Sequence, residues 1–140
     1  MTSKKINDSA FKTMTTLSLI ANTVWGTLFL LLLVACVFNS EAVLNSTKDS
    51  ISPNELFGNL IVLFLILSAI VVILCWFCIR GISRMKKGEL RGFYTYALTN
   101  GLWALLQIYI GSDGTIPYLI SGVVSIIFIF YFALKLPKFS

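Results

Sequence analysis

The sequence predicts an all-α integral membrane protein: a four-helix (tetraspan) bundle in one transmembrane domain, with both termini in the cytoplasm. Hydrophobic residues make up 57% of the 140 residues and charged residues only 12%, whereas charged residues are about a quarter of a soluble domain. Four long apolar runs approach or exceed the roughly 20 residues that cross a bilayer. Most basic residues lie at the ends of these runs, which is typical of topology signals.

The first predicted helix covers residues 15–38. The run from Thr13 to Ser40 carries no charged residue and is longer than the apolar core of about 7–15 residues in a cleaved signal peptide. An uncleaved spanning helix is therefore the main interpretation. The tetrapeptide Leu33–Cys36 resembles the lipobox of bacterial lipoprotein signals, so processing at Cys36 is the alternative.

The later elements follow in order: an outer loop (39–52), a second helix (53–80), a basic inner loop (81–91), a third helix (92–112) and a fourth helix (117–136). Ser52, Pro53 and Glu55 form a helix start in which serine caps, proline occupies the first turn and glutamate bonds back to the cap. Gly81 is the expected end of the second helix. A tight turn at Gly111–Gly114 separates the last two helices.

The basic residues predict the orientation. With both termini inside, ten of the eleven lysines and arginines lie on the inner side and only Lys48 lies outside, as the positive-inside rule requires. This arrangement explains the net charge of +5 without nucleic-acid binding. Five basic residues in or beside the inner loop are expected to set the topology, with anionic lipid headgroups or an acidic partner as alternative roles: Arg80, Arg84, Lys86, Lys87 and Arg91.

The motif Asn-x-x-Trp-x-x-Leu occurs in both the first and the third predicted helix. The two helices cross in the same direction, and both motifs lie at a similar depth, so their side chains can meet. Two helical hairpins derived from a duplication would produce such a repeat, and coincidence is the alternative. The matched positions are Asn22, Trp25 and Leu28, and Asn100, Trp103 and Leu106.

Polar and aromatic residues of the third helix recur at spacings that place them on one face. Small and amide side chains in membrane helices usually pack helices together, so we predict a packing face inside the bundle or between subunits. A ligand-binding face is the alternative. The face comprises Asn22, Trp25, Tyr96, Asn100, Trp103 and Gln107, with Ser18, Ser121 and Ser125 as possible neighbours on the first and fourth helices.

Several chemistries lack the residues that they need. The chain has no histidine, and the interior of the predicted spans has no charged residue, whereas proton-coupled transporters usually depend on one. Metal and nucleophile–base sites are also disfavoured. Cys75 and Cys78 form a C-x-x-C pair near the negative end of a helix, where a reactive thiolate is unfavourable, so we expect apolar packing. No enzyme, metal site or cofactor is predicted.

The segment from Gly81 to Tyr96 joins a lysine-rich turn to the helix start Gly92–Tyr96. It resembles a connection found in small uncharacterised four-helix membrane proteins of Bacteroidota. The resemblance implies a location in the bacterial inner (plasma) membrane and no known activity.

These observations favour a non-enzymatic multi-pass membrane protein. The main hypothesis is a structural or accessory subunit, whose partners are the lipid bilayer and other membrane subunits or copies of itself. A small channel, carrier or lipid-handling protein that uses the polar face of the third helix is the alternative. A toxin-immunity or stress-response protein that shields the membrane is a third possibility, and no nucleic-acid partner is expected.

Overall fold

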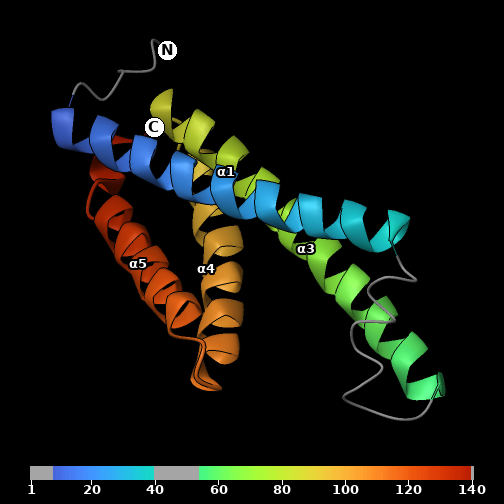
Figure 1. Ribbon diagram of the computed structural model, residues 1–140. Helices are drawn as coiled ribbons and strands as arrows, with labels where there is room; N and C mark the ends of the chain where they lie inside the picture. Colours follow the sequence, from blue (N-terminus) through green and yellow to red (C-terminus); the bar gives the residue numbers. More distant parts are fainter. Residues whose placement is uncertain (1–7, 40–53, 140) are drawn as a thin grey trace.

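The computed structural model describes residues 8–39 and 54–139, with side chains from residue 62 onwards in the second segment. This part of the chain is α-helical (Figure 1). Its elements are α1 (Ser9–Phe38), α3 (Asn54–Lys86), α4 (Leu90–Ser112), α5 (Ile116–Ala133) and the short 3₁₀ helix η1 (Leu136–Lys138). By length and composition α1, α5 and Val62–Lys86 of α3 can cross a membrane, whereas α4 is too polar on average to be counted with them.

The first helix begins at Ser9 rather than at residue 15, because Asp8 caps it. The Asp8 backbone is extended, and its side chain accepts a hydrogen bond from the Ala10 N–H at 3.1 Å. Such a cap satisfies one of the unpaired donors at a helix start. The apolar run therefore marks only part of the helix, which continues beyond it on the N-terminal side.

Helix α3, which corresponds to the second predicted helix, continues to Lys86, so residues 81–86 of the predicted basic inner loop are helical. Gly81 does not end the helix as predicted. A Cβ at Gly81 would lie 2.9 Å from the backbone nitrogen of Tyr96, so this glycine instead permits a close approach between α3 and α4. The shorter turn is closed at Gly88, whose φ of 82° lies in the left-handed region that favours glycine.

The remaining boundaries shift slightly. α4 begins at Leu90 instead of 92, and α5 ends at Ala133 instead of 136. Pro137 lacks a backbone N–H to continue the helix, and the chain turns into η1 there. The predicted outer loop, apart from Asn39, lies outside the described residues, and so do Ser52 and Pro53 of the predicted helix start.

Figure 1 shows the start of α1, the end of α3, the start of α4 and the end of α5 gathered at one end of the bundle. Ring contacts hold this end together: the Phe139 centroid lies 5.8 Å from that of Phe11 and 6.5 Å from that of Phe93. We call it the terminal end, because both described ends of the chain meet there. From it, the α1–α3 pair and the α4–α5 pair diverge (Figure 1).

The central helix is α4, which packs on both α3 and α5, while α1 packs along α3 and touches α5 only briefly. Two buried clusters support it. The cluster at the terminal end includes Phe11, Ile82, Met85, Tyr96 and Phe132. The second consists of Phe29, Val71, Cys75 and Trp103. Because Asn100 lies between Tyr96 and Trp103 on α4, a polar site is flanked by both clusters.

An ion pair joins the two described ends of the chain. Lys135 Nζ lies 2.8 Å from Asp8 Oδ2, and Lys138 Nζ lies 3.6 Å from the same oxygen. The hydrogen bond from Lys135 lowers the pKa of Asp8 below its ordinary value of 3.8. The same hydrogen bond raises the pKa of Lys135 above its ordinary 10.5. The pair therefore stabilises the fold between these pH limits.

We expect Asp8→Asn to remove the acid-sensitive part of this stabilisation. The Asp8 contribution is present above about pH 4 and is lost as the pH falls through the lowered pKa, while that of Lys135 is lost as the pH rises through its raised pKa. Asparagine is also a good N-cap, so the helix start is preserved. Thermal unfolding in detergent should show a smaller drop in Tm towards pH 3 than in the wild type. An identical drop would mean that the pair contributes nothing to folding.

Candidate functional site

The predicted polar face of α4 is buried inside the bundle. Tyr96, Asn100, Trp103 and Gln107 are each at most 1% exposed, and they lie against α1 and α5. The apolar residues Leu98, Leu102 and Leu105 of the same helix are 67%, 51% and 65% exposed. The middle of the helix therefore hides its polar groups from its surroundings, and the low average hydropathy of α4 does not describe the outer surface there.

Hydrogen bonds connect three helices around Asn100. The hydroxyl groups of Ser18 on α1 and Tyr96 on α4 lie 2.6 Å apart. Asn100 Nδ2 donates to the Tyr96 hydroxyl at 3.0 Å and to the backbone carbonyl of Ser125 on α5 at 3.3 Å. On α1, Asn22 Nδ2 donates to the Ser18 carbonyl at 2.8 Å. These bonds use both protons of the Asn100 amide group.

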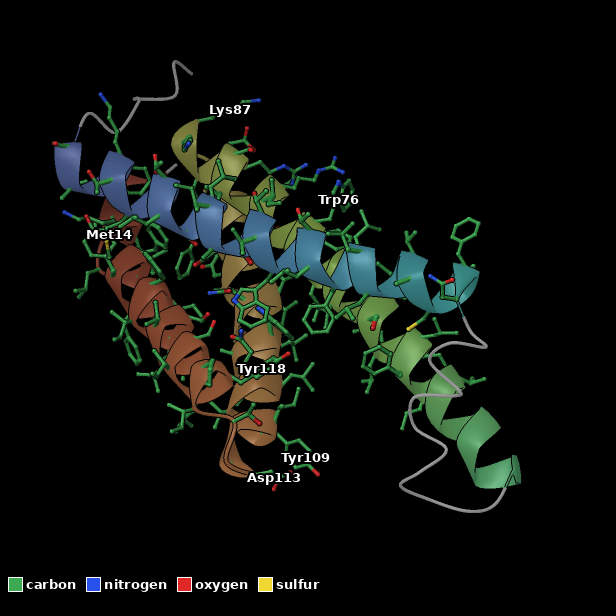
Figure 2. The ribbon with its side chains drawn as sticks, in the orientation of Figure 1. Met14, Trp76, Lys87, Tyr109, Asp113 and Tyr118 are labelled. Carbon is green, nitrogen blue, oxygen red and sulfur yellow. The ribbon has the colours of Figure 1, made fainter. Side chains whose placement is uncertain are left out.

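A second group of bonds lies farther along α4. Trp25 Nε1 and Gln107 Nε2 both donate to the Ser121 hydroxyl, at 3.0 and 2.8 Å. The Trp25 and Trp103 rings meet edge to face, with centroids 5.8 Å apart. The ring centroid of Tyr118, which is labelled in Figure 2, lies 5.1 Å from that of Trp25. The two Asn-x-x-Trp motifs thus come together in the fold, while their origin by duplication stays a prediction.

A small cavity lies among these residues, with about 30 Å³ of room for the centres of water-sized molecules. One such molecule needs roughly 10–15 Å³ by this measure, so the cavity holds about two or three. Its walls come from α1, α4 and α5 and carry no charged side chain: Ser18, Ala21, Asn22, Trp25, Tyr96, Asn100, Trp103, Ser121, Val124, Ser125 and Phe128. Among these residues Ala21 and Val124 are exposed, so the cavity lies close to the surface between α1 and α5.

Two amide oxygens in the cavity wall have no hydrogen-bond partner. Asn22 and Asn100 are 4% and 1% exposed, and the Oδ1 atom of each is buried and unpartnered. An unsatisfied buried polar group costs about 1–3 kcal/mol. Both oxygens are themselves covered by protein atoms, and the oxygen of Gln107, which lies outside the cavity wall, is also buried without a partner.

The cavity does not suit an ion. Moving an ion from water into a medium of low dielectric costs on the order of 20 kcal/mol in the idealised case. A charge-assisted hydrogen bond returns about 1.5–3 kcal/mol and a ring face about 2 kcal/mol. Two oxygens and two rings therefore do not offset the desolvation cost of an ion. The amide oxygens would also repel an anion. An uncharged polar molecule fits this chemistry better.

The basic residues lie away from this cavity. The Arg80 guanidinium lies over the Trp76 ring, 5.4 Å from its centroid, and Arg84 Nε lies 3.9 Å from Glu89. Lys86 and Arg91 are exposed near the α3–α4 turn, and Figure 2 shows Lys87 at the same end of the molecule. None of the five lines the cavity, and their role in topology or headgroup binding stays a prediction.

The cysteines are buried and unpaired. Cys75 and Cys78 are 1% and 0% exposed and belong to the two packed clusters. The Cys78 sulfur also lies 3.2 Å from the Thr99 hydroxyl. Cys75 and Cys78 therefore pack between α3 and the neighbouring helices. Cys36 on α1 is also buried.

Sequence reasoning nominated six residues of the polar face and, on the fourth helix, Ser121 and Ser125, but it did not identify the cavity or the part of its wall formed by Val124 and Phe128. Phe128 gave no signal beyond its apolar character. The Ser125 carbonyl that holds Asn100 is a backbone atom, which no sequence pattern marks. The sequence also did not predict that Gln107 lies outside the cavity wall, although it binds Ser121 within that wall.

Comparison with known proteins gives no relative for this chain: no family model, no curated protein and no solved structure matches it significantly. The function is therefore argued from the geometry of the site.

Proposed function

We propose that this chain is a non-enzymatic multi-pass membrane protein that binds a small uncharged polar molecule near the middle of the bilayer, and that it acts as a small carrier or channel. The observation that carries the proposal is the cavity of about 30 Å³ among uncharged polar and aromatic side chains of α1, α4 and α5. A lipid headgroup is too large for a space of about 30 Å³, so lipid handling at this site is not part of the proposal.

The depth of the cavity supports a place in the middle of the membrane. At 1.5 Å per residue, Asn100 lies about 14 Å along α4 from Arg91, and Ser125 lies about 15 Å along the chain from Lys135. If these basic residues mark the inner surface, the cavity lies about halfway across a hydrocarbon core of about 30 Å. Carriers commonly bind their substrates at this depth.

The proposal requires α4 to be the fourth span. Its 23 residues extend about 35 Å at the helical rise, which is sufficient to cross. Its polar face is covered by α1 and α5, leucines are exposed along its middle, and Tyr94 and Tyr109 are exposed near its ends. The excess of basic residues at the terminal end then favours a cytoplasmic location for that end, and the resemblance to Bacteroidota proteins favours the bacterial inner membrane.

A role as an accessory subunit or homo-oligomer is the second candidate. The polar face cannot provide the contact expected for it, because Asn100 and Gln107 are buried within this chain. The divergence of the α1–α3 pair from the α4–α5 pair (Figure 1) still favours a partner helix. Mild-detergent extraction followed by size determination and mass spectrometry would support this candidate by a stoichiometric partner.

Urea flux tests the proposed function directly. Purified protein in liposomes is expected to accelerate urea entry, measured as osmotic swelling by stopped-flow light scattering, relative to empty liposomes. Asn100→Leu should lower the protein-dependent rate about tenfold, because it removes the hydrogen bonds that hold Tyr96 and Ser125 in the cavity wall. The loss of one buried hydrogen bond of about 1.4 kcal/mol corresponds to this factor.

Thr99→Val is the matched control for this experiment. Thr99 is the buried neighbour of Asn100, but its hydroxyl contacts Cys78 on α3 and does not line the cavity. It should keep the wild-type rate. Equal rates in wild-type and empty liposomes, or in wild type and Asn100→Leu, would contradict transport through this cavity.

A further inference from the structure

One exposed side of the last turns of α3 carries apolar residues that are followed by basic ones. Trp76, Arg80, Ser83 and Lys87 recur every three or four residues, so they share one side of the helix, and each of them is exposed. Exposed Ile73 continues this side into the apolar part of α3. In Figure 2, Lys87 lies beside the end of α3 and Trp76 lies farther along the same helix. We call this side the outer face of α3.

An aromatic ring, and not a carboxylate, positions the Arg80 guanidinium. Its Cζ atom lies 5.4 Å from the centroid of the Trp76 ring, which is within the range of a cation–π contact. The Trp76 ring packs in turn edge to face on Phe77, with centroids 5.0 Å apart. Within the described residues, no hydrogen bond or ion pair engages Arg80. Because the N–H donors of a guanidinium lie in its plane, a ring over one face leaves them available to an oxyanion.

Arg84 adds a second positive charge one helical turn beyond Arg80. Arg84 Nε lies 3.9 Å from Glu89 Oε2, which is too long for a hydrogen bond. Glu89 therefore balances part of the charge without occupying the donors of Arg84. Exposed Ser83 lies beside both arginines in the sequence and adds a hydroxyl group. Two arginines against one carboxylate leave an excess of positive charge, which an anionic group complements.

The position of these groups along the helix indicates which anionic group they meet. Arg80 lies about 9 Å along the axis from Lys86 at the end of α3, and the exposed residues on its other side are apolar: Ile73, Trp76 and Phe77. Tryptophan rings in membrane proteins are enriched at the level of the lipid headgroups. A phospholipid has its phosphate at this level and its acyl chains on the apolar side. A soluble phosphate has no part that would contact the apolar side.

We propose that the outer face of α3 binds an anionic phospholipid. Arg80 and Arg84 hold the phosphate group, the Ser83 hydroxyl is a further donor, and an acyl chain lies along the apolar part of the face. Lys86 is exposed at the same end of α3, but it follows Arg80 by six residues and so lies on another side of the helix at about 100° per residue. This lipid site is separate from the cavity, because none of its residues lines the cavity.

Fluorine NMR of fluorotryptophan-labelled protein in detergent can measure lipid binding at this face. The chain has three tryptophans, and the signal that disappears in Trp76→Phe belongs to Trp76. We expect phosphatidylglycerol to shift this signal with a midpoint concentration at least fivefold lower than that of phosphatidylcholine with the same acyl chains. The signal of buried Trp103 should stay in place and shows that the protein is folded. Glycerol phosphate, which has no acyl chains, should cause no shift at the same concentrations.

Two charge-removing variants separate a defined site from a diffuse surface charge. Arg80→Gln should raise the midpoint for phosphatidylglycerol about fivefold, because a basic residue near an anionic surface contributes about this factor, or about 1 kcal/mol. Lys86→Gln is the matched control, since it removes the same charge from another side of the same helix. It should change the midpoint less than twofold.

Four results would overturn the proposal. Equal midpoints for the two lipids would do so, and this comparison uses the wild type alone, so it decides the matter even if a variant fails to fold. Equal effects of Arg80→Gln and Lys86→Gln would show diffuse attraction without a site. A shift of the Trp76 signal with glycerol phosphate would assign the site to a free phosphate. No shift with either lipid would leave the basic residues to topology or to an acidic protein partner.

Discussion

Replacing Gly92 with alanine is expected to break the packing of α3 on α4 and to prevent a stable bundle. A Cβ at Gly92 would lie 2.6 Å from the backbone nitrogen of Met85 and 2.8 Å from the carbonyl oxygen of Gly81. Real Cβ atoms essentially never come closer than 3.0 Å to such atoms. Because the obstacles are backbone atoms, relief requires one helix to move away from the other.

The expected loss of folding stability is large for the addition of a single methyl group. Overpacking a tight interior costs about 1–3 kcal/mol and occasionally more, and the backbone clash favours the upper part of this range. Close approach of small residues is also a principal source of helix association in membranes, where lipid is as apolar as the helix surface. Thermal unfolding in detergent should show a much lower Tm for Gly92→Ala.

Gly101→Ala provides the matched control on the same helix. Its added Cβ would have only Ile129 Cδ1 nearby, at the ordinary contact distance of 3.8 Å. Alanine is a better helix former than glycine by up to about 1 kcal/mol, so stability should be unchanged or slightly higher. Equal losses for the two variants would contradict the close crossing of α3 and α4 at Gly92.

Much of the polar face follows from the sequence because helical spacing determines which residues share a side. Tyr96, Asn100, Trp103 and Gln107 are placed together by spacing alone, and the Trp25–Trp103 contact agrees with the equal depth of the two motifs. Their burial inside one chain could not be predicted in the same way. The same spacing serves equally for a contact between helices of one chain and for a contact between subunits.

The helix boundaries illustrate a different limit. An apolar run measures the part of a helix that lies in lipid, so it gives no information on the capped turn that begins after Asp8. Gly81 has the properties of a helix end when read alone. Its actual surroundings depend on Gly92, which approaches from another helix, and such pairing of two glycines is a property of the tertiary structure.

The cavity depends on atoms that carry no sequence signal. The carbonyls of Ser18 and Ser125 determine which way the asparagine amides point. Replacing either serine would leave its carbonyl in place. Sequence reasoning could therefore nominate Asn22 and Asn100, but only the fold shows how their amide groups are oriented in the cavity wall.

The proposed position of the cavity at the middle of the bilayer depends on α4 crossing the membrane. If α4 crosses, the α3–α4 turn and the α4–α5 turn lie on opposite sides of the membrane. Figure 2 shows Lys87 at the first of these ends and Asp113 at the other. Exposed positions at the two ends can therefore report the topology.

Cysteine labelling with a membrane-impermeant maleimide determines whether α4 crosses the membrane. Single Lys86→Cys and Asp113→Cys variants are treated in intact cells and after lysis, with the wild type as the background control because Cys36, Cys75 and Cys78 are buried. We expect Asp113→Cys to be labelled in intact cells and Lys86→Cys only after lysis. Labelling of both variants from the same side would mean that α4 does not cross, and it would contradict a binding site in the middle of the membrane.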